Sequence, residues 1–119
     1  MREPERDSLR LNHIKQACLD LIEMVQEIDI DSLPEKDLRY FGIVKILEII
    51  GEASYMLSKE FISSHPLTPW NEIIKMRHIL VHGYYTVNPL FVKSTVKENI
   101  APLLLQINTY IKEINNPQL

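Results

Sequence analysis

Glycine and cysteine are scarce in this sequence, and no long apolar run occurs. The 119 residues include three glycines and one cysteine, Cys18, so an internal disulfide and a metal site built from several cysteines of one chain are excluded. No stretch approaches the roughly 20 apolar residues that a membrane helix needs. With 45% hydrophobic and 24% charged residues, residues 1–119 are expected to form one globular domain. The charged first ten residues argue against a secretory signal, and a cytoplasmic location is expected.

A positive charge balance is also lacking. The formal net charge is −3, which argues against a nucleic-acid-binding surface that covers the whole molecule. Between Asn71 and Asn99, however, four lysines and arginines occur with only two glutamates, and His78 and His82 lie in the same stretch. Any polyanion is therefore expected to bind locally, around this segment.

Helical periodicity dominates the sequence instead. Apolar residues recur every three or four positions from Glu5 to Ile28, which predicts a first amphipathic helix over that range. A second helix is expected to begin near Leu33 or Pro34, because Ser32 is followed three residues later by an acid, the capping-box pattern. Its apolar residues continue to Leu57 and surround the helix, which predicts that this helix is central, packs on a second chain, or both.

Two further helices are expected after a loop with two prolines, SSHPLTPW. Thr68 and Pro69 suit the N-cap and first turn of a third helix. That helix is expected over Trp70–Gly83, with the glycine as a natural C-terminal cap. A fourth is expected over Asn88–Ile114, with a kink at Pro102. Four helices joined by short loops predict an all-α fold, an up-and-down antiparallel four-helix bundle.

The stretch RHILVHGYY, residues 77–85, places reactive side chains at the end of an otherwise apolar helix. Arg77 shares a face with apolar neighbours, so its guanidinium must reach the rim, pair with an acid, or point into a polar cleft. His82 lies five residues further on, about 140° around an ideal helix. The two groups therefore meet only if the last turn frays, if the arginine bends, or if a second subunit completes the site.

An arginine and a histidine together suit phosphodiester cleavage without a metal. The imidazole can accept a proton from a ribose 2′-OH or donate one to a leaving oxygen, and a guanidinium can stabilise the charge that develops on the phosphate. The 2′-OH implies RNA as the substrate. Neither a metal nor another cofactor is expected, because no acidic cluster accompanies the histidines.

The same residues also allow a structural interpretation. Arg77 would then be a buried ion-pair partner, with Glu52 or Glu48 as the acid. His82 would be a C-terminal helix cap, and the two tyrosines after Gly83 would be packing residues.

Several segments, spread over nearly the whole chain, form a pattern more specific than the spacing of one arginine and one histidine. In order they are DLRYFGIVKILEIIGEA, IIGEASYMLSKEF, HPLTPWNEIIKMR and LVHGYY. This joint pattern resembles the HepT-like branch of the HEPN superfamily. The resemblance implies an all-helical homodimer whose paired motifs face a shared cleft.

The motif of that family is an arginine, four residues, a histidine, one residue and a tyrosine, which falls on Arg77, His82 and Tyr84. By resemblance, Arg77 and His82 are the catalytic residues of a metal-independent RNase toxin that acts on RNA such as tRNA or mRNA. Tyr84 is the residue to which a partner nucleotidyltransferase of the MNT type attaches AMP. That modification adds bulk and negative charge where RNA phosphate must bind, and so neutralises the toxin.

Two residues depart from the family pattern, and two other functions stay open. His78 stands where a small polar residue is usual, and Tyr85 where phenylalanine commonly follows, which leaves the modified tyrosine ambiguous. Glu52 is expected to position Arg77. The chain could instead be a non-catalytic partner that docks the nucleotidyltransferase and presents Tyr84, or a structural dimer with no activity.

The remaining polar residues have ordinary interpretations. His13 and His65 are expected to be surface or loop groups. Lys75, Lys93 and Lys97 either guide RNA or are solvated surface lysines.

Overall fold

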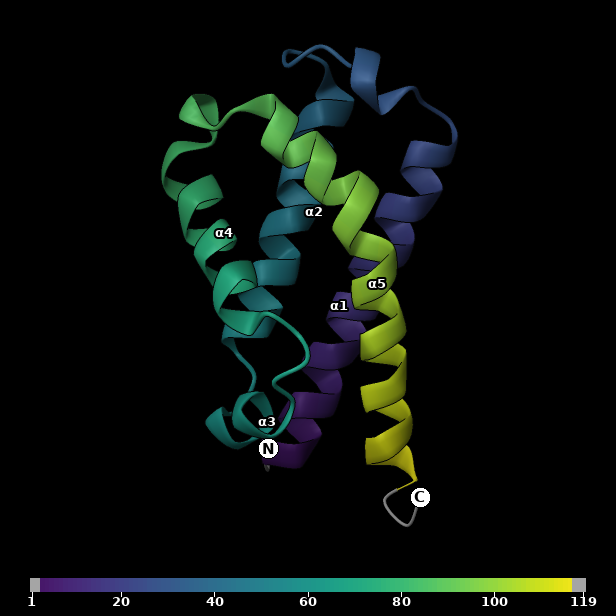
Figure 1. The fold of residues 1–119 in the computed structure, drawn as a ribbon, viewed down its shortest axis with the longest axis vertical. Helices are drawn as coiled ribbons and strands as arrows, with labels where there is room; N and C mark the ends of the chain where they lie inside the picture. Colours follow the sequence, from purple (N-terminus) through teal and green to yellow (C-terminus); the bar gives the residue numbers. More distant parts are fainter. Residues whose placement is uncertain (1–2, 117–119) are drawn as a thin grey trace.

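All regular secondary structure in the described part of the chain is helical. The computed structural model describes residues 3–116, except the side chains at positions 3, 4 and 84. No strand occurs among them, so the all-α class is confirmed. The elements in Figure 1 are α1 (Glu3–Gln26), the 3-10 helix η1 (Ile30–Ser32), α2 (Leu38–Tyr55), α3 (Lys59–Ser64), α4 (Trp70–Gly83), the 3-10 helix η2 (Tyr84–Thr86) and α5 (Pro89–Asn115).

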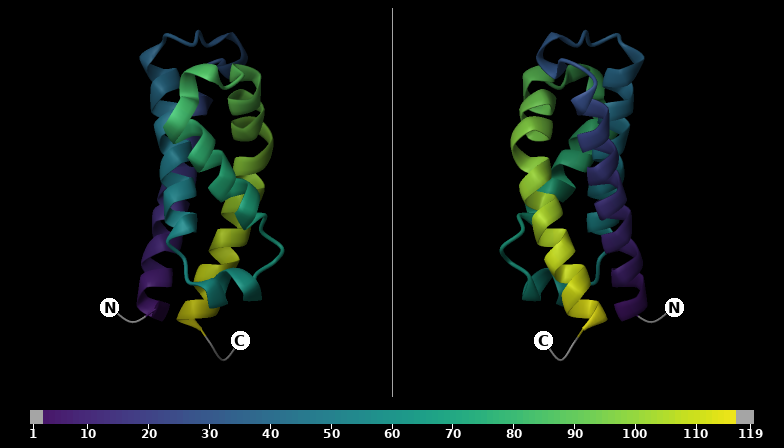
Figure 2. Two further views of the ribbon diagram at one scale, coloured as in Figure 1. Left: turned by 90° about the vertical axis from the view of Figure 1, so that its left-hand side faces the viewer. Right: turned by 90° about the vertical axis from the view of Figure 1, so that its right-hand side faces the viewer.

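The four long helices run in alternating directions. In Figures 1 and 2, α1 and α4 start near the end that holds α3, and α2 and α5 return to it. α2 packs against both α1 and α4, and α1 packs against α5. The side of α2 that faces neither neighbour therefore stays uncovered, and it carries exposed residues: Leu38, Phe41, Lys45, Ile49, Glu52 and Met56.

One cluster of buried apolar side chains joins the helices. Cys18 belongs to it, and burial raises the pKa of its thiol to about 12, so the sulfur is protonated and inert at neutral pH. No described helix has the length and apolar character to cross a membrane. The large aliphatic members with no exposed surface are Leu11, Ile14, Leu21, Ile43, Leu47, Leu80 and Ile107.

The second helix begins later than predicted. Asp37 caps α2, because its carboxylate accepts a hydrogen bond from the backbone N–H of Arg39 at 2.8 Å. The side-chain hydrogen bonds from Arg39 are the main reason that the pKa of Asp37 falls to about 2, so the cap is ionised at neutral pH. The capping box predicted from Ser32 and Glu35 is wrong: Ser32 ends η1, and its hydroxyl donates to the Asp29 carboxylate.

A short helix, α3, occupies part of the region expected to be a loop. Ser58 caps it by accepting a hydrogen bond from the N–H of Phe61 at 3.1 Å. The buried carboxylate of Asp7, in α1, accepts from the backbone N–H of Ser58 at 2.8 Å and from its hydroxyl at 2.7 Å. The start of α3 is thus fixed by a residue 51 positions away, which no local pattern reveals.

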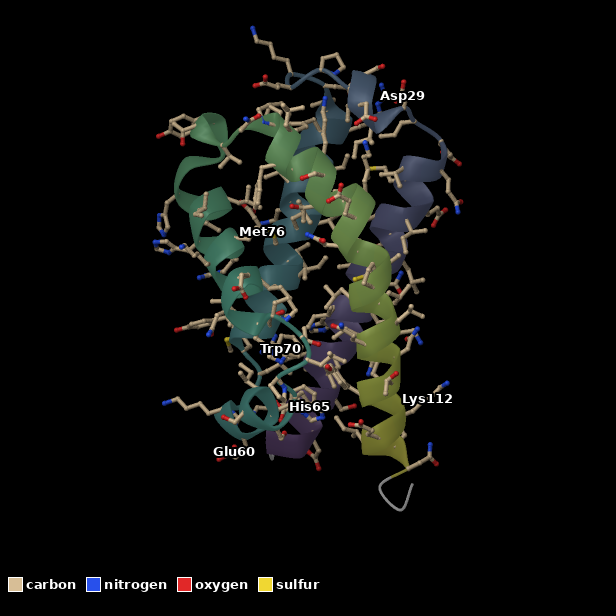
Figure 3. The ribbon with its side chains drawn as sticks, viewed as in Figure 1. Asp29, Glu60, His65, Trp70, Met76 and Lys112 are labelled. Atoms are coloured by element: carbon tan, nitrogen blue, oxygen red, sulfur yellow. The ribbon has the colours of Figure 1, made fainter. Side chains whose placement is uncertain are left out.

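His65, just after α3, is packed and is not a free surface group. Its ring stacks on Phe61 with centroids 3.9 Å apart, and its Nε2 lies 3.0 Å from the carboxylate of Glu113 in α5. Its carbonyl accepts a hydrogen bond from the indole of Trp70 at 2.9 Å, and Figure 3 shows the two residues together beside α3. Trp70 is buried and anchors the start of α4.

The later helices begin and end close to the predicted residues, but the predicted caps of α4 are wrong. The hydroxyl of Thr68 hydrogen-bonds to Gln106 and Tyr110 in α5 and not to the start of α4. Asn88 caps α5 by accepting from the N–H of Leu90 at 2.9 Å. α4 ends at Gly83, but no glycine in the described residues adopts a positive φ, so the chain passes into η2 without a left-handed cap. α5 continues through Pro102, and Figure 1 shows its axis bending along its length.

Replacing Asp7 tests the link between α1 and α3. Asp7→Ala is expected to lower the free energy of unfolding by roughly 1.5–3 kcal/mol, because Ser58 loses a charged acceptor for both of its donors. Urea denaturation of the two purified proteins measures the difference. The control is Asp20→Ala, which removes an exposed carboxylate from the same helix and is expected to change stability by less than about 0.5 kcal/mol. Equal effects of the two variants would contradict the assignment.

Candidate functional site

Arg77 lies where α4 comes closest to α2. A Cβ placed on Gly51 of α2 would overlap the Cβ of Arg77 and lie 3.1 Å from its Cα. Only a residue without a side chain therefore fits opposite the arginine backbone. Gly51 was not singled out from the sequence, although an isolated glycine inside an apolar helix is typical of such a close approach.

Two residues near the end of α2 hold the guanidinium of Arg77. Its Nε lies 2.6 Å from Oε2 of Glu52, and its Cζ lies 5.4 Å from the centre of the Tyr55 ring, within the range of a cation–π contact. The buried Nε makes no aligned hydrogen bond, so the contact with Glu52 is an ion pair. Tyr55 was not among the residues predicted for the site.

The terminal nitrogens of Arg77 remain available. In the part of the chain that the structure describes, no protein group accepts a hydrogen bond from either of them. The side chain is 28% exposed, so these donors are within reach of a ligand. A guanidinium fixed through Nε and open at its outer edge matches the geometry of bidentate phosphate recognition.

Arg77 and Glu52 line a hollow of about 400 Å³ on the uncovered side of α2. α1 contributes Arg10 and His13 to its wall, and α2 contributes Lys45. His82 is not among the lining residues. Another hollow, of about 420 Å³ between α4 and α5, is lined mainly by apolar side chains and contains none of the predicted site residues. The hollow beside Arg77 is therefore the candidate site.

His78 and His82 lie together on the exposed side of α4. Their ring centres are 4.6 Å apart, and both residues are exposed. α4 is continuous from Trp70 to Gly83, so its last turn does not fray to bring His82 to the arginine. Within residues 3–116, no three side chains of His, Cys, Asp or Glu gather closely enough to hold a metal ion.

The tyrosines that follow the helix begin η2. The side chain of Tyr84 lies outside the described residues, and Tyr85 is 77% exposed. The hydroxyl of Thr86 donates to the carbonyl of Gly83 at 2.8 Å. This hydrogen bond ties the turn that carries both tyrosines to the end of α4.

Two of the three lysines considered for RNA guidance are engaged within the chain. Lys93 donates to the backbone carbonyls of Asp31 and Leu33. Lys97 pairs with the carboxylate of Asp31 at 2.9 Å, and this hydrogen bond raises the pKa of the lysine. They tie α5 to the loop around η1, and Lys75 is exposed on α4.

Comparison with known proteins gives a family and several relatives. A family model described as ribonuclease HepT-like matches residues 14–110. A protein of Caldanaerobacter subterraneus subsp. tengcongensis, named a putative RNase, is 37% identical over 103 residues, which cover 87% of this chain and 92% of the relative. A protein of Thermococcus cleftensis, named "Probable ribonuclease HepT", is 36% identical over 93 residues, which cover 78% and 84%. No solved structure matches the chain.

An added methyl group at Gly51 tests the crossing of α2 and α4. Gly51→Ala is expected to lower the free energy of unfolding by about 1–3 kcal/mol, because the methyl group must push the backbone of Arg77 away. The matched control is Gly42→Ala in the same helix, where the nearest atom to a new Cβ is Met24 Cε at 3.8 Å. That control is expected to be neutral or stabilising by up to roughly 1 kcal/mol. Urea denaturation measures both, and a Gly51→Ala protein as stable as the control would show that the helices do not cross so closely.

Proposed function

Because this chain belongs to the HepT-like ribonuclease family, we propose that it cleaves RNA without a metal and that Arg77 and His82 are its catalytic residues. The family match confirms the expected enzyme class, a ribonuclease. The residues and the mechanism are our proposal. The observation that carries it is the Arg77 guanidinium, which is fixed by Glu52 and keeps its terminal nitrogens free at the edge of a hollow.

The arginine would bind the scissile phosphate and stabilise its extra negative charge. A guanidinium stays protonated throughout the physiological range, and its two terminal nitrogens can donate to two phosphate oxygens at once. Donors already oriented before the reaction are more effective than donors that must rearrange during it. The ion pair with Glu52 and the ring of Tyr55 provide that orientation.

The histidine would transfer protons. An imidazole that accepts the 2′-OH proton lets the 2′-oxygen attack phosphorus, and the bond from phosphorus to the 5′-oxygen then breaks. A protonated histidine donates its proton to that leaving oxygen. One strand is left with a 2′,3′-cyclic phosphate and the other with a 5′-hydroxyl. Two copies of His82 across a dimer axis would supply one base and one acid.

A homodimer would supply the second histidine and bring it to the arginine. We propose that the four long helices form an up-and-down bundle and that two such bundles meet along α2 and α4, with the motifs facing a shared cleft. Exposed apolar residues beside the hollow support this surface: Ile49 is 41% exposed, Tyr55 58% and Val81 46%. Within one chain, Arg77 lies against α2 and His82 points to the other side of α4, so a second subunit is needed to join them.

The proposed partner is a nucleotidyltransferase of the MNT type, which would act as the antitoxin. AMP attached to the hydroxyl of Tyr84, two residues after His82, would place a phosphate close to the proposed cleft and repel RNA. Tyr85 is the other candidate for this modification. The alternative function, a non-catalytic protein that only presents Tyr84 to the transferase, predicts modification without RNA cleavage.

Removal of either catalytic side chain tests the nuclease. In buffer with EDTA, the protein is expected to cleave RNA, and Arg77→Ala and His82→Ala are each expected to lower kcat by at least about 100-fold. Gel analysis of a labelled RNA measures the rate. Arg39→Ala, which removes an exposed arginine paired with Asp37, serves as the matched control and should keep full activity.

Light scattering and thermal melting separate a catalytic role from a structural one. The ion pair between Arg77 and Glu52 is partly exposed and contributes little to stability, so Arg77→Ala is expected to stay folded and dimeric. Full cleavage by both variants would remove these residues from the mechanism. An inactive variant that is also unfolded or monomeric would favour the structural role.

Modification at the tyrosine is a separate prediction. Incubation with the partner transferase and ATP is expected to add one AMP to the wild-type chain and to Tyr85→Phe, but none to Tyr84→Phe. Mass spectrometry of the intact protein measures the addition. The modified protein is expected to lose RNA cleavage. Addition to Tyr84→Phe, with none to Tyr85→Phe, would move the modification to Tyr85.

A further inference from the structure

A second phosphate-binding position lies beside Arg77. This inference rests on the proposed ribonuclease function and extends it to the path of the substrate. We propose that Arg10 and His13 of α1, together with Lys45 of α2, bind the RNA backbone next to the phosphate that Arg77 contacts. None of the three was expected from the sequence to be part of the site.

The hollow brings these residues together from distant parts of the chain. Arg10 and His13 are three residues apart and thus on the same face of α1, and both line the hollow with Lys45 and Arg77. Lys45 is seven residues, or about two turns, before Glu52, which places it roughly 10 Å from the arginine along α2. That separation suits a different phosphate of the same strand.

Arg10 is a partly buried cation that lines the hollow. Among the residues that the structure describes, no carboxylate lies within 4 Å of its guanidinium nitrogens. Arg39 and Arg77 each lie within 4 Å of a carboxylate. Within the described part of the chain, Arg10 thus has an unpaired guanidinium beside the hollow, and an anion in the hollow would give it a partner.

The charge of the hollow is opposite to that of the whole chain. Its wall holds the cations Arg10, Lys45 and Arg77 against two glutamates, Glu48 and Glu52, whereas the chain has a net charge of −3. Lys45 lies 3.7 Å from Glu48, and its side chain is 71% exposed. Such a long, exposed ion pair is weak, so a phosphate of the substrate can replace Glu48 as the partner of Lys45.

RNA binding by an inactive protein tests this position. In the His82→Ala background, Arg10→Ala and Lys45→Ala are each expected to weaken binding of a single-stranded oligoribonucleotide roughly 3- to 10-fold. Each should also reduce the slope of log K against log salt concentration by about 0.7, the value for one lost phosphate contact on a single strand. Fluorescence anisotropy at several salt concentrations measures both quantities.

The matched control is Lys112→Ala. Lys112 is an exposed lysine near the end of α5 (Figure 3) and does not line the hollow, so the same charge is lost without the local contact and the slope should not change. With His82 intact, Arg10→Ala and Lys45→Ala are expected to raise KM and to leave kcat within about twofold, because they bind substrate away from the reacting bond.

Three results would overturn the inference. The first is a salt slope for both variants equal to that of Lys112→Ala. The second is dissociation of the dimer by Arg10→Ala in light scattering, which would assign the hollow to subunit contacts. The third is a lower kcat at unchanged KM.

If wild-type protein cleaves RNA and the two variants behave like the control, the second position alone fails. If wild-type protein neither binds nor cleaves RNA, the proposed function fails with it. Lys45 is largely exposed, so its variant keeps the test valid should Arg10→Ala not fold.

Discussion

The contact between Gly51 and the backbone of Arg77 governs the geometry of the candidate site. Because α2 has no side chain at this position, α4 approaches until Arg77 lies directly against the helix. Glu52 is the next residue, and Tyr55 lies one turn after Gly51, so the same crossing brings a carboxylate and an aromatic face to the guanidinium. The orientation of the arginine is thus a consequence of helix packing. The partly exposed ion pair with Glu52 refines that orientation but contributes little to folding.

What the sequence predicts well is what neighbouring residues determine. The four long helices follow the apolar period, and the cap of α5 at Asn88 depends on a residue within one turn of the helix start. The start of α2 was missed because Ser32 and Asp37 both suit a cap, and the local sequence does not rank them. α3 was missed because its cap is tied to Asp7, 51 residues away. Gly51 was missed for the same reason, since its importance depends on the helix that packs against it.

Charge shows the same limit of local reasoning. The segment from Asn71 to Asn99 is positive along the sequence, yet in space Lys93 and Lys97 turn away from Arg77 to hold the loop around η1. Their place beside the arginine is taken by Arg10 and Lys45, which come from two other helices. A count of charges along a chain therefore identifies a basic region of the sequence but not a basic region of the surface, because side chains on one helix face in different directions.

Because α4 is a continuous helix, Arg77 and His82 lie on different sides of it. Arg77 is directed toward α2 by the crossing, and five residues of regular helix then direct His82 away from it. A helix cannot present both groups to one phosphate unless a second surface brings another histidine to the arginine. Exposed apolar residues flank the arginine on α2 and α4, and such a patch favours association with another protein. If that protein is a second copy of the chain, each arginine faces a histidine from across the interface. Dimerisation would then be a requirement of the chemistry and not only of stability.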